Sequence, residues 1–334
     1  MPISADKTPI PVALLQPWVE DNHKFIDDIA RRNEVMTGLP ARRGEFDIRE
    51  VQLCEPVPLA AVDAAVMRIS LGDMLHLLIQ AIRVTDDGET TLGAVVRASG
   101  VDGHEMRQSA TPLRIAEECA LLAAAESTTI ADTSFWSLLM EVNQAITLRE
   151  HHSNPHLVEA VDRLTAQGLF LRAIRNDRIV AMSKRGEAKT VDRHVSDREA
   201  FGRILRAGEF VQPKPISEAL QGNFGIEKRG FNNEEREQIR EIYEKWLGVT
   251  YYKPHEWSRA YRIEGHLEIL NSRQRLFPIL SAIHRQTMVR SIIEPWPQFL
   301  ADYTAKQISH VALLYGDHNY HRSPFHHPRT KHVR

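Results

Sequence analysis

The chain has 334 residues, of which 43% are hydrophobic, so it can bury the core of one large domain or of two ordinary ones. Its net charge of −2 lacks the basic surplus of most proteins that capture nucleic acid unaided, so a local patch or a partner would have to supply basic contacts. Cys54 and Cys119 have no metal-ligand spacing, and we expect both to be buried thiols in a reducing cytosol. No stretch approaches the roughly 20 apolar residues of a membrane span, and the N-terminus lacks a signal-peptide pattern, so we expect a soluble cytoplasmic protein with no membrane segment.

The first predicted element is an amphipathic helix over residues 16–34, which follows a proline-containing lead-in. Its apolar side chains either pack on the core of the same chain or dock the helix on a partner. Docking would use Trp18, Phe25, Ile26 and Ile29 as apolar anchors, because buried aromatic side chains dominate interface energies.

Apolar runs separated by turn signals predict three strands in the next part of the chain. We expect them over residues 58–69, 76–84 and 93–99, the last of them short and within an excursion over residues 86–110.

Helices and strands alternate in the middle of the chain. Thr111 is predicted to cap the first of these helices, with Pro112 at the first helical position, where proline is tolerated. A hairpin turn at NDR is expected to join the last two strands. The helices are predicted over residues 111–127, 135–148 and 155–167, and the strands over residues 128–132, 169–174 and 178–184.

The last third of the chain begins with residues 185–230, a polar, largely irregular stretch. Asn233 is then expected to cap a helix that Gly248 ends. Further helices are predicted over residues 196–206, 275–289 and 295–316, and strands over residues 249–254 and 259–269. This order of strands and helices argues for an α/β protein with a mixed sheet flanked by helices.

Carboxylates at the ends of apolar strands are the most informative feature of the sequence. Asp63 ends the run VPLAAVD, Asp132 ends TTIAD, and Glu117 and Glu118 lie on the helix between them. A charge at the end of an apolar strand is costly unless it is paired or binds a metal. Carboxylates that converge from several elements suit Mg²⁺ or Mn²⁺. Such a cage is what phosphodiester hydrolysis by two metal ions requires.

Each of these acids also has a structural interpretation. Asp63 could be a buried structural aspartate, and Asp132 could cap the helix that follows it. Helical periodicity does not separate Glu117 from Glu118. We expect one of the two to face the site and the other to face solvent, and we favour Glu118 for the site.

Four polar residues further along the chain also have structural interpretations. Lys184 ends an apolar strand, where it is either a solvated strand end or a point charge on a phosphate. His284 lies on an apolar helix face, where a lone histidine is commonly a core residue. Asp197 is expected to cap a helix, and Glu264 could form a structural pair with Arg262.

Several short segments resemble the NurA nucleases, in the same order, over about residues 57–310. AAVDAA has the family's strand with an aspartate, and a glutamate on the following helix comes next. IADTSFWSLL has its strand, aspartate and helix, and IVAMSK has its strand with a lysine. Three later segments also match: SDREAFGRILRAGE, AYRIE and FPILSAIHR. The resemblance implies an RNase H-like core, a homodimer, Mn²⁺-dependent cleavage of DNA and partnership with a HerA-like hexameric ATPase.

The resemblance also implies roles for particular residues. Asp63, Asp132 and Glu118 or Glu117 would be catalytic ligands of two Mn²⁺ (or Mg²⁺) ions. As catalytic residues beside them, Lys184 would offset charge on the phosphate and His284 would be a metal ligand or proton carrier.

Two motifs depart from the family pattern: VDGS reads VDAA here, and DG reads DT. Despite these departures, the function that the resemblance implies is a deoxyribonuclease that works with a HerA-like ATPase in DNA end processing or anti-phage defence. The alternative is a catalytically inactive scaffold that binds the ATPase ring and DNA.

These expectations divide the chain into three parts. Residues 1–50 form an N-terminal helical docking segment, residues 51–315 an RNase H-like nuclease domain with an insertion around residues 185–250, and residues 316–334 a basic, histidine-rich tail.

Overall fold

The computed structural model describes residues 12–71, 74–101, 103–151, 154–183, 188–220, 225–292 and 294–307. Its centre is a mixed sheet of ten strands in the order β1-β7-β9-β10-β6-β5-β2-β3-β4, with β8 beside β9. The strands are β1 Ile48–Glu50, β2 Ala60–Leu71, β3 Met74–Thr85, β4 Thr90–Gly100, β5 Thr129–Ala131, β6 Ile179–Ala181, β7 Glu209–Val211, β8 Lys214–Pro215, β9 Leu247–Lys253 and β10 Tyr261–His266.

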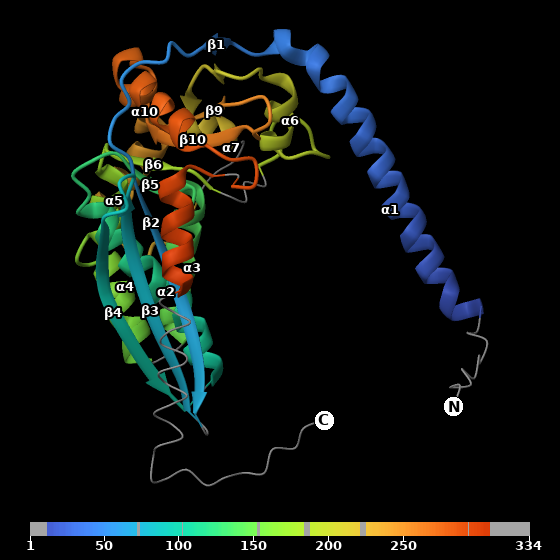
Figure 1. Ribbon diagram of the computed structural model, residues 1–334. Helices are drawn as coiled ribbons and strands as arrows, with labels where there is room; N and C mark the ends of the chain where they lie inside the picture. The colour runs from blue at the N-terminus through green and yellow to red at the C-terminus, as the bar shows by residue number, and fades with distance from the viewer. Residues whose placement is uncertain are drawn as a thin grey trace, which may run out of the picture.

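The strands β2, β3 and β4 form a long antiparallel meander, which Figure 1 shows as the blue-green arrows. β5 pairs parallel with β2, and β6 pairs parallel with β5. β10 then joins β6 in the antiparallel sense. This arrangement confirms the predicted α/β fold with a mixed sheet flanked by helices. β4 is longer than predicted, since it stays paired with β3 from Thr90 to Gly100.

Helices cover both faces of the sheet because its central strands are apolar on both sides. One face packs against α2 (Gly103–Ala123), α3 (Phe135–His151), α4 (Pro155–Leu164) and α5 (Leu169–Arg175). The other face packs against α9 (Leu267–Leu270), α10 (Arg273–Gln286) and helical residues 296–307. Figure 1 shows this last helix in red, lying along the meander. It brings a late part of the chain beside β2.

The strands at the other end of the sheet pack against a smaller set of elements. α6 (Asp197–Ile204) and the 3₁₀-helix η1 (Leu39–Glu45) enclose a third apolar cluster with β7 and β9. The remaining helices are α7 (Ile216–Leu220), α8 (Asn233–Glu241) and the π-helical turn η2 (Ile242–Trp246).

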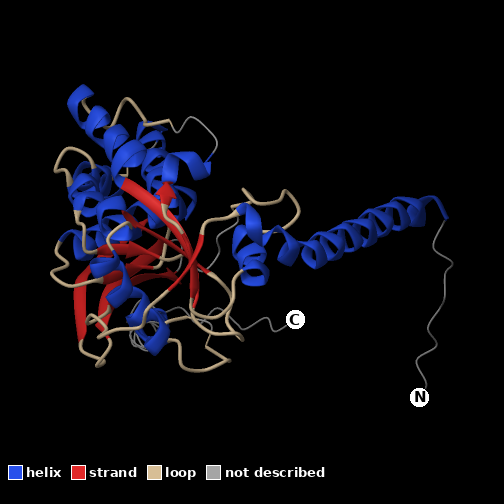
Figure 2. Ribbon diagram, turned by 90° about the horizontal axis from the view of Figure 1, so that it is seen from above, coloured by secondary structure: helices blue, strands red, loops and turns tan. Residues whose placement is uncertain are grey.

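The N-terminal helix α1 (Val12–Gly38) extends away from the rest of the protein, as Figures 1 and 2 both show. Phe25, Ile26 and Ile29 are 63%, 59% and 44% exposed. Arg32 forms an ion pair with Glu199, and Val35 and Met36 pack against the third apolar cluster. These contacts hold the C-terminal end of the helix. The predicted helix is therefore confirmed, and Phe25, Ile26 and Ile29 do not pack on the core of the chain.

Two predictions in the middle of the chain are wrong. Residues 169–174 form helix α5, because a short apolar run fits a buried helix as well as a strand and Leu169, Phe170 and Ala173 have helical spacing. Thr111 does not cap a helix: α2 begins at Gly103 and Pro112 lies inside it. Proline removes one helical hydrogen bond there, and burial of α2 against the sheet offsets that cost.

The helix boundaries near residue 240 also differ from those predicted. Asn232, not Asn233, caps α8, in a reciprocal pair of bonds with Glu235. Gly248 lies within β9 rather than after a helix, because the chain re-enters the sheet at Leu247. The predicted strand over 259–269 ends early, at His266, where α9 follows.

The helix predicted over residues 295–316 is confirmed for residues 296–307; its remainder and the tail 316–334 lie outside the described residues. Among the helices that the structure does describe, none is long and apolar enough to cross a membrane.

Candidate active site

The candidate site lies where two neighbouring strands separate. β2 and β5 pair only from Ala60 to Val62, after which β5 ends and β2 continues, paired on its other side with β3. Asp63 and Asp132 are the next residues on the two strands. Val62 and Ala131, the residues before the two aspartates, pack on the α2 face. Since side chains alternate along a strand, both aspartates lie on the opposite side, which is the side of helical residues 296–307.

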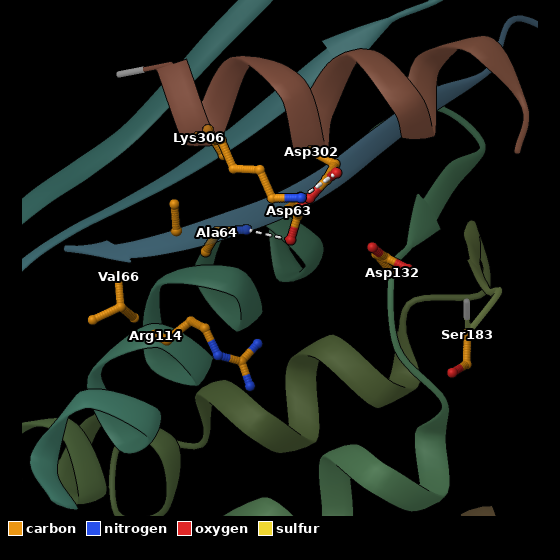
Figure 3. Close-up of a pocket in the computed structure, with 10 residues that line it drawn as sticks. Asp63, Ala64, Val66, Arg114, Asp132, Ser183, Asp302 and Lys306 are labelled. Carbon is orange, nitrogen blue, oxygen red and sulfur yellow. Dashed lines mark hydrogen bonds and ion pairs between the residues drawn. The ribbon is translucent and has the colours of Figure 1, made fainter. Parts of the chain in front are cut away.

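These two aspartates border one cavity. The cavity has a volume of about 570 Å³. Figure 3 shows it enclosed by β2, α2 and helical residues 296–307. Its lining combines acids, bases and small residues: Asp63, Ala64, Ala65, Val66, Arg114, Asp132, Ser183, Asp302, Ala305 and Lys306.

Hydrogen bonds orient the two aspartates. The Ala64 amide donates to Asp63 Oδ1 at 2.8 Å. Gln298 Nε2 donates to Asp132 Oδ1 and to the Met182 carbonyl, both at 2.9 Å. Gln298 therefore ties the end of β5 to the end of β6 and holds Asp132 at the mouth between the strands.

Glu117 and Glu118 are both buried, so the prediction that one faces solvent is wrong. Glu117 turns toward α4 and pairs with Arg163. Glu118 pairs with Arg114, whose Nη1 donates to its Oε1 at 2.6 Å. Burial raises the pKa of Glu118 above its ordinary value, and the charges of Glu141 and Asp132 raise it further, against the opposing effect of Arg114. Glu118 is thus the glutamate coupled to the site, although neither glutamate lines the cavity.

The structure does not bring His284 to this cavity. Its ring lies 4.2 Å from the ring of His255, between centroids, and His255 in turn stacks on Trp257. α10 packs on the sheet through Ile279, Leu280 and Ile283, which leaves His284 turned toward the loop after β9. Burial and the nearby His255 lower the pKa of His284 below its ordinary value. Lys184 lies outside the described residues.

The metal-ligand set expected from the sequence is therefore not assembled as predicted. Within the described residues, no three His, Cys, Asp or Glu side chains form a group that could hold an ion. Glu118 is bound by Arg114, and Asp302 is bound by Lys306 at 2.7 Å. Asp63 and Asp132 supply the candidate oxygen donors of the cavity. That pair fits a hard divalent ion, which proteins often hold through one or two carboxylates together with waters and substrate phosphates.

Four polar residues near the site were missed from the sequence: Arg114, Gln298, Asp302 and Lys306. Arg114 lies four residues before Glu118, and Asp302 lies four residues before Lys306. Opposite charges at this spacing on a predicted helix are the local signal that could have found them. Nothing local places helical residues 296–307 against β2.

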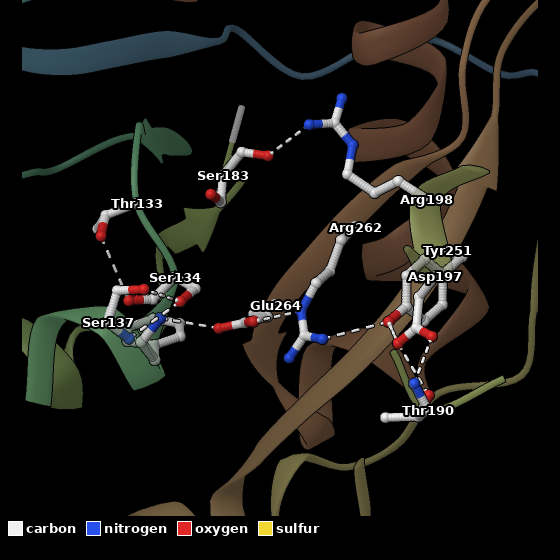
Figure 4. Close-up of polar contacts among 11 residues, drawn as sticks. Thr133, Ser134, Ser137, Ser183, Thr190, Asp197, Arg198, Tyr251, Arg262 and Glu264 are labelled. Atoms are coloured by element: carbon white, nitrogen blue, oxygen red, sulfur yellow. Dashed lines mark hydrogen bonds and ion pairs between the residues drawn. The ribbon is translucent and has the colours of Figure 1, made fainter. Parts of the chain in front are cut away.

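A buried polar network supports the turn that follows Asp132, as Figure 4 shows. Glu264 Oε2 accepts a hydrogen bond of 2.7 Å from the Phe135 amide, at the first turn of α3. Its Oε1 pairs with Arg262 Nε at 2.6 Å, which matches the structural interpretation of this pair. Arg262 Nη1 donates to the Tyr251 hydroxyl at 3.2 Å, which donates to Asp197 Oδ2 at 2.8 Å.

Asp197 closes this network and is not the helix cap that we predicted. Ser196 caps α6, in a reciprocal pair of bonds with Glu199. Asp197 is the first residue of that helix, fully buried, and accepts hydrogen bonds from Thr190 and from the Val191 amide. The network therefore runs from the segment before α6 to the start of α3.

Comparison with solved structures identifies the fold. The NurA nuclease from Sulfolobus solfataricus superposes with a TM-score of 0.59 at 13% identity, over 96% of this chain and 100% of that one. A structure of NurA with manganese has a TM-score of 0.55 at 11% identity, and one of NurA bound to dAMP and manganese has 0.55 at 10% identity. Each covers 89% of this chain, with 96% and 94% of the other chain. No protein-family model and no curated protein matches the sequence. The chain has the fold of the NurA nucleases.

Proposed function

We propose that this protein is a nuclease that hydrolyses phosphodiester bonds in DNA. The observation that carries the proposal is the pair Asp63 and Asp132, which directly follow the parallel pairing of β2 with β5 and border one cavity of about 570 Å³. The fold adds support, because a NurA structure of the same fold contains manganese and dAMP.

The proposed chemistry uses a Mn²⁺ or Mg²⁺ ion held by the carboxylates of Asp63 and Asp132. When bound, such an ion lowers the pKa of water and stabilises charge on phosphate oxygens. The residues of the chain do the rest: Gln298 fixes the orientation of Asp132, and Ala64 and Ala65 leave room beside Asp63 for a phosphate group. The second ion of the predicted pair would need ligands from the substrate and water.

A nuclease assay tests this proposal directly. The full chain is incubated with labelled single-stranded and double-stranded DNA in Mn²⁺, in Mg²⁺ and in EDTA. Cleavage in Mn²⁺ that EDTA abolishes is the expected result. Metal-independent cleavage, or none on any DNA substrate with or without a HerA-like ATPase, would reject the proposal.

A non-catalytic scaffold is the second candidate, and one observation favours it. Arg114 and Lys306 already neutralise acids around the cavity, through Glu118 and Asp302. Calorimetric titration with Mn²⁺ separates the candidates. An active nuclease binds Mn²⁺ and loses this binding on Asp63→Asn, whereas a scaffold gives the same trace for both proteins.

We further propose that the protein acts as a homodimer docked on a HerA-like hexameric ATPase through α1. The support is the exposure of Phe25, Ile26 and Ile29 on a helix that extends away from the sheet. A symmetric dimer would present two copies of this helix to the ring. The net charge of −2 suits a nuclease to which a motor delivers DNA.

Deleting residues 1–30 should leave the thermal unfolding midpoint nearly unchanged, because Phe25, Ile26 and Ile29 bury little surface on their own chain. The truncation keeps Arg32 and Met36, which anchor the base of α1. Cleavage of short single strands should persist, and stimulation by the ATPase should disappear. A fall of several degrees in the midpoint would instead mean that the helix stabilises its own domain.

Replacing His284 by alanine should leave the Mn²⁺-dependent cleavage rate close to that of the wild type. His284 packs against His255 rather than lining the cavity. Rates are compared per folded protein, with circular dichroism as the measure of folding. A large loss of activity in well-folded H284A would show that His284 does take part in catalysis.

A further inference from the structure

We propose that Arg114 is the residue that contacts the substrate phosphate in this cavity, and that Glu118 and Glu141 position its guanidinium. The inference rests on the proposed function, because it assigns a role within the same site. It also gives Glu118 a different task from the metal ligation expected from the sequence.

Two acids on different helices hold the guanidinium of Arg114. Nη1 donates to Glu118 of α2 at 2.6 Å. Nη2 donates to both carboxylate oxygens of Glu141 of α3, at 3.1 Å and 3.0 Å. Because planar, multiply bonded guanidinium groups have few accessible orientations, Arg114 is fixed before any ligand arrives.

Arg114 nevertheless remains open to the cavity. It is one of the lining residues, and Figure 3 shows its side chain directed toward the space that Asp63 and Asp132 border. The side chain is 24% exposed. Arg114 is therefore buried enough to be rigid and exposed enough to meet an anion.

The cavity requires such a cation if it accepts a phosphodiester. Asp63, Asp132 and Asp302 make its lining acidic, and like charges repel a phosphate. Among the described residues, Lys306 is the second cation of the lining, but it is 64% exposed and paired with Asp302 one helical turn away. A flexible, exposed ammonium is a weaker preorganised contact than a clamped guanidinium.

The acids near Arg114 have two different roles in this scheme: one pair is proposed to bind the metal, and the other pair orients Arg114. Asp63 and Asp132 line the cavity, while the carboxylates of Glu118 and Glu141 pair with Arg114. Glu118 and Glu141 are positioning residues in this scheme. Arg114 is the catalytic contact, since it meets the negative charge that develops on the non-bridging oxygens.

The test compares Arg114→Gln, Arg114→Lys and Glu141→Gln with Arg107→Gln, which removes an exposed arginine from the same helix. We expect R114Q to lower kcat by about 10²–10³-fold, as loss of a preorganised donor does. R114K should recover only part of this loss, because an ammonium cannot bridge two acids and a phosphate in one plane. E141Q should show a smaller loss, mainly in kcat, and R107Q none.

A binding measurement in EDTA makes the inference independent of cleavage. Anisotropy of a short labelled oligothymidylate is followed at several salt concentrations. R114Q should weaken binding and reduce the slope of log K against log salt by about one unit, and R107Q should leave the slope unchanged. A merely structural role would alter the melting midpoint but not this slope.

The outcomes separate this inference from the proposed function. If the wild type binds the oligonucleotide in an Arg114-dependent way but cleaves no DNA in Mn²⁺, the nuclease proposal fails and the phosphate contact stands. If folded R114Q matches R107Q in kcat, KM and salt slope, the phosphate contact is wrong even in an active nuclease. If R114Q unfolds, folded R114K is compared with R107Q in kcat alone, because lysine keeps the charge that sets the salt slope; a kcat equal to that of R107Q overturns the inference.

Discussion

Replacing Asp63 or Asp132 by asparagine is expected to lower Mn²⁺-dependent DNA cleavage by at least about a hundredfold, because each change removes one of the two carboxylates that we propose hold the metal ion in the cavity. Asparagine has nearly the same volume, so the shape of the cavity is kept. Folding should also be kept, since removing one charge from an acidic cavity reduces repulsion between its carboxylates.

Initial rates on a labelled single strand, measured over a Mn²⁺ titration, provide the test. The matched control is Asp177→Asn, which removes an aspartate that pairs with Arg275 outside the cavity. Near wild-type cleavage by folded D63N or D132N would end the assignment of these residues. If high Mn²⁺ concentrations restore the cleavage rate of a variant, the replaced residue is a ligand that contributes to the affinity for Mn²⁺.

The sequence sufficed for Asp63 and Asp132 because the information there is local. Asp132 directly follows β5 and marks its end. The prediction that Asp63 also ends its strand is wrong, because β2 continues to Leu71. Both residues nevertheless follow the parallel pairing of β2 with β5 directly, which makes them neighbours. The register Val62 to Ala131 then places the two aspartates side by side in the sheet order. The same logic fails for His284, since an amphipathic helix reveals its buried face but not which neighbour its half-buried edge meets.

The partner of Glu117 depends on tertiary packing, whereas the partner of Glu118 lies one turn away on the same helix. Arg163 of α4 pairs with Glu117, whereas Arg114 pairs with Glu118 and with Glu141 of α3. Periodicity within α2 carries no information on these contacts with other helices. Helical residues 296–307 are a stronger case: their helical character was predictable, but their return to β2, which places Asp302 and Lys306 at the cavity, is a long-range contact.

The error at α5 has a different origin. Leu169, Phe170, Ala173 and Ile174 are buried and would be equally apolar in a strand. The parallel pairing of β5 with β6 decides the matter, because parallel neighbours need a crossover connection and helices normally provide it. Sequence alone does not reveal that these two strands are parallel.

Removing the carboxylate of Glu264 should destabilise the protein more than the loss of an exposed acid. Glu264 and Arg262 are 1% and 5% exposed in their side chains, and the glutamate also caps the first turn of α3 through the Phe135 amide. Breaking one partner of a buried pair leaves an uncompensated charge and costs about 3–5 kcal/mol. An unfolding entropy of about 2.1 cal/mol/K per residue gives roughly 1.4 °C per kcal/mol for a chain of 334 residues, so the melting midpoint of Glu264→Ala should fall by about 4–7 °C.

Thermal melts of Glu264→Ala, Glu268→Ala and a paired replacement, Arg262→Met with Glu264→Leu, test this prediction. Glu268 pairs with Arg275 at the surface with 88% of its side chain exposed, so its loss should shift the midpoint by little. The paired replacement should recover much of the stability, because apolar side chains of similar volume avoid the cost of desolvating two charges. It should not recover cleavage: a leucine side chain accepts no hydrogen bond from the Phe135 amide, so the turn that carries Asp132 loses its support. A midpoint of E264A equal to that of E268A would show that the network in Figure 4 contributes nothing to folding.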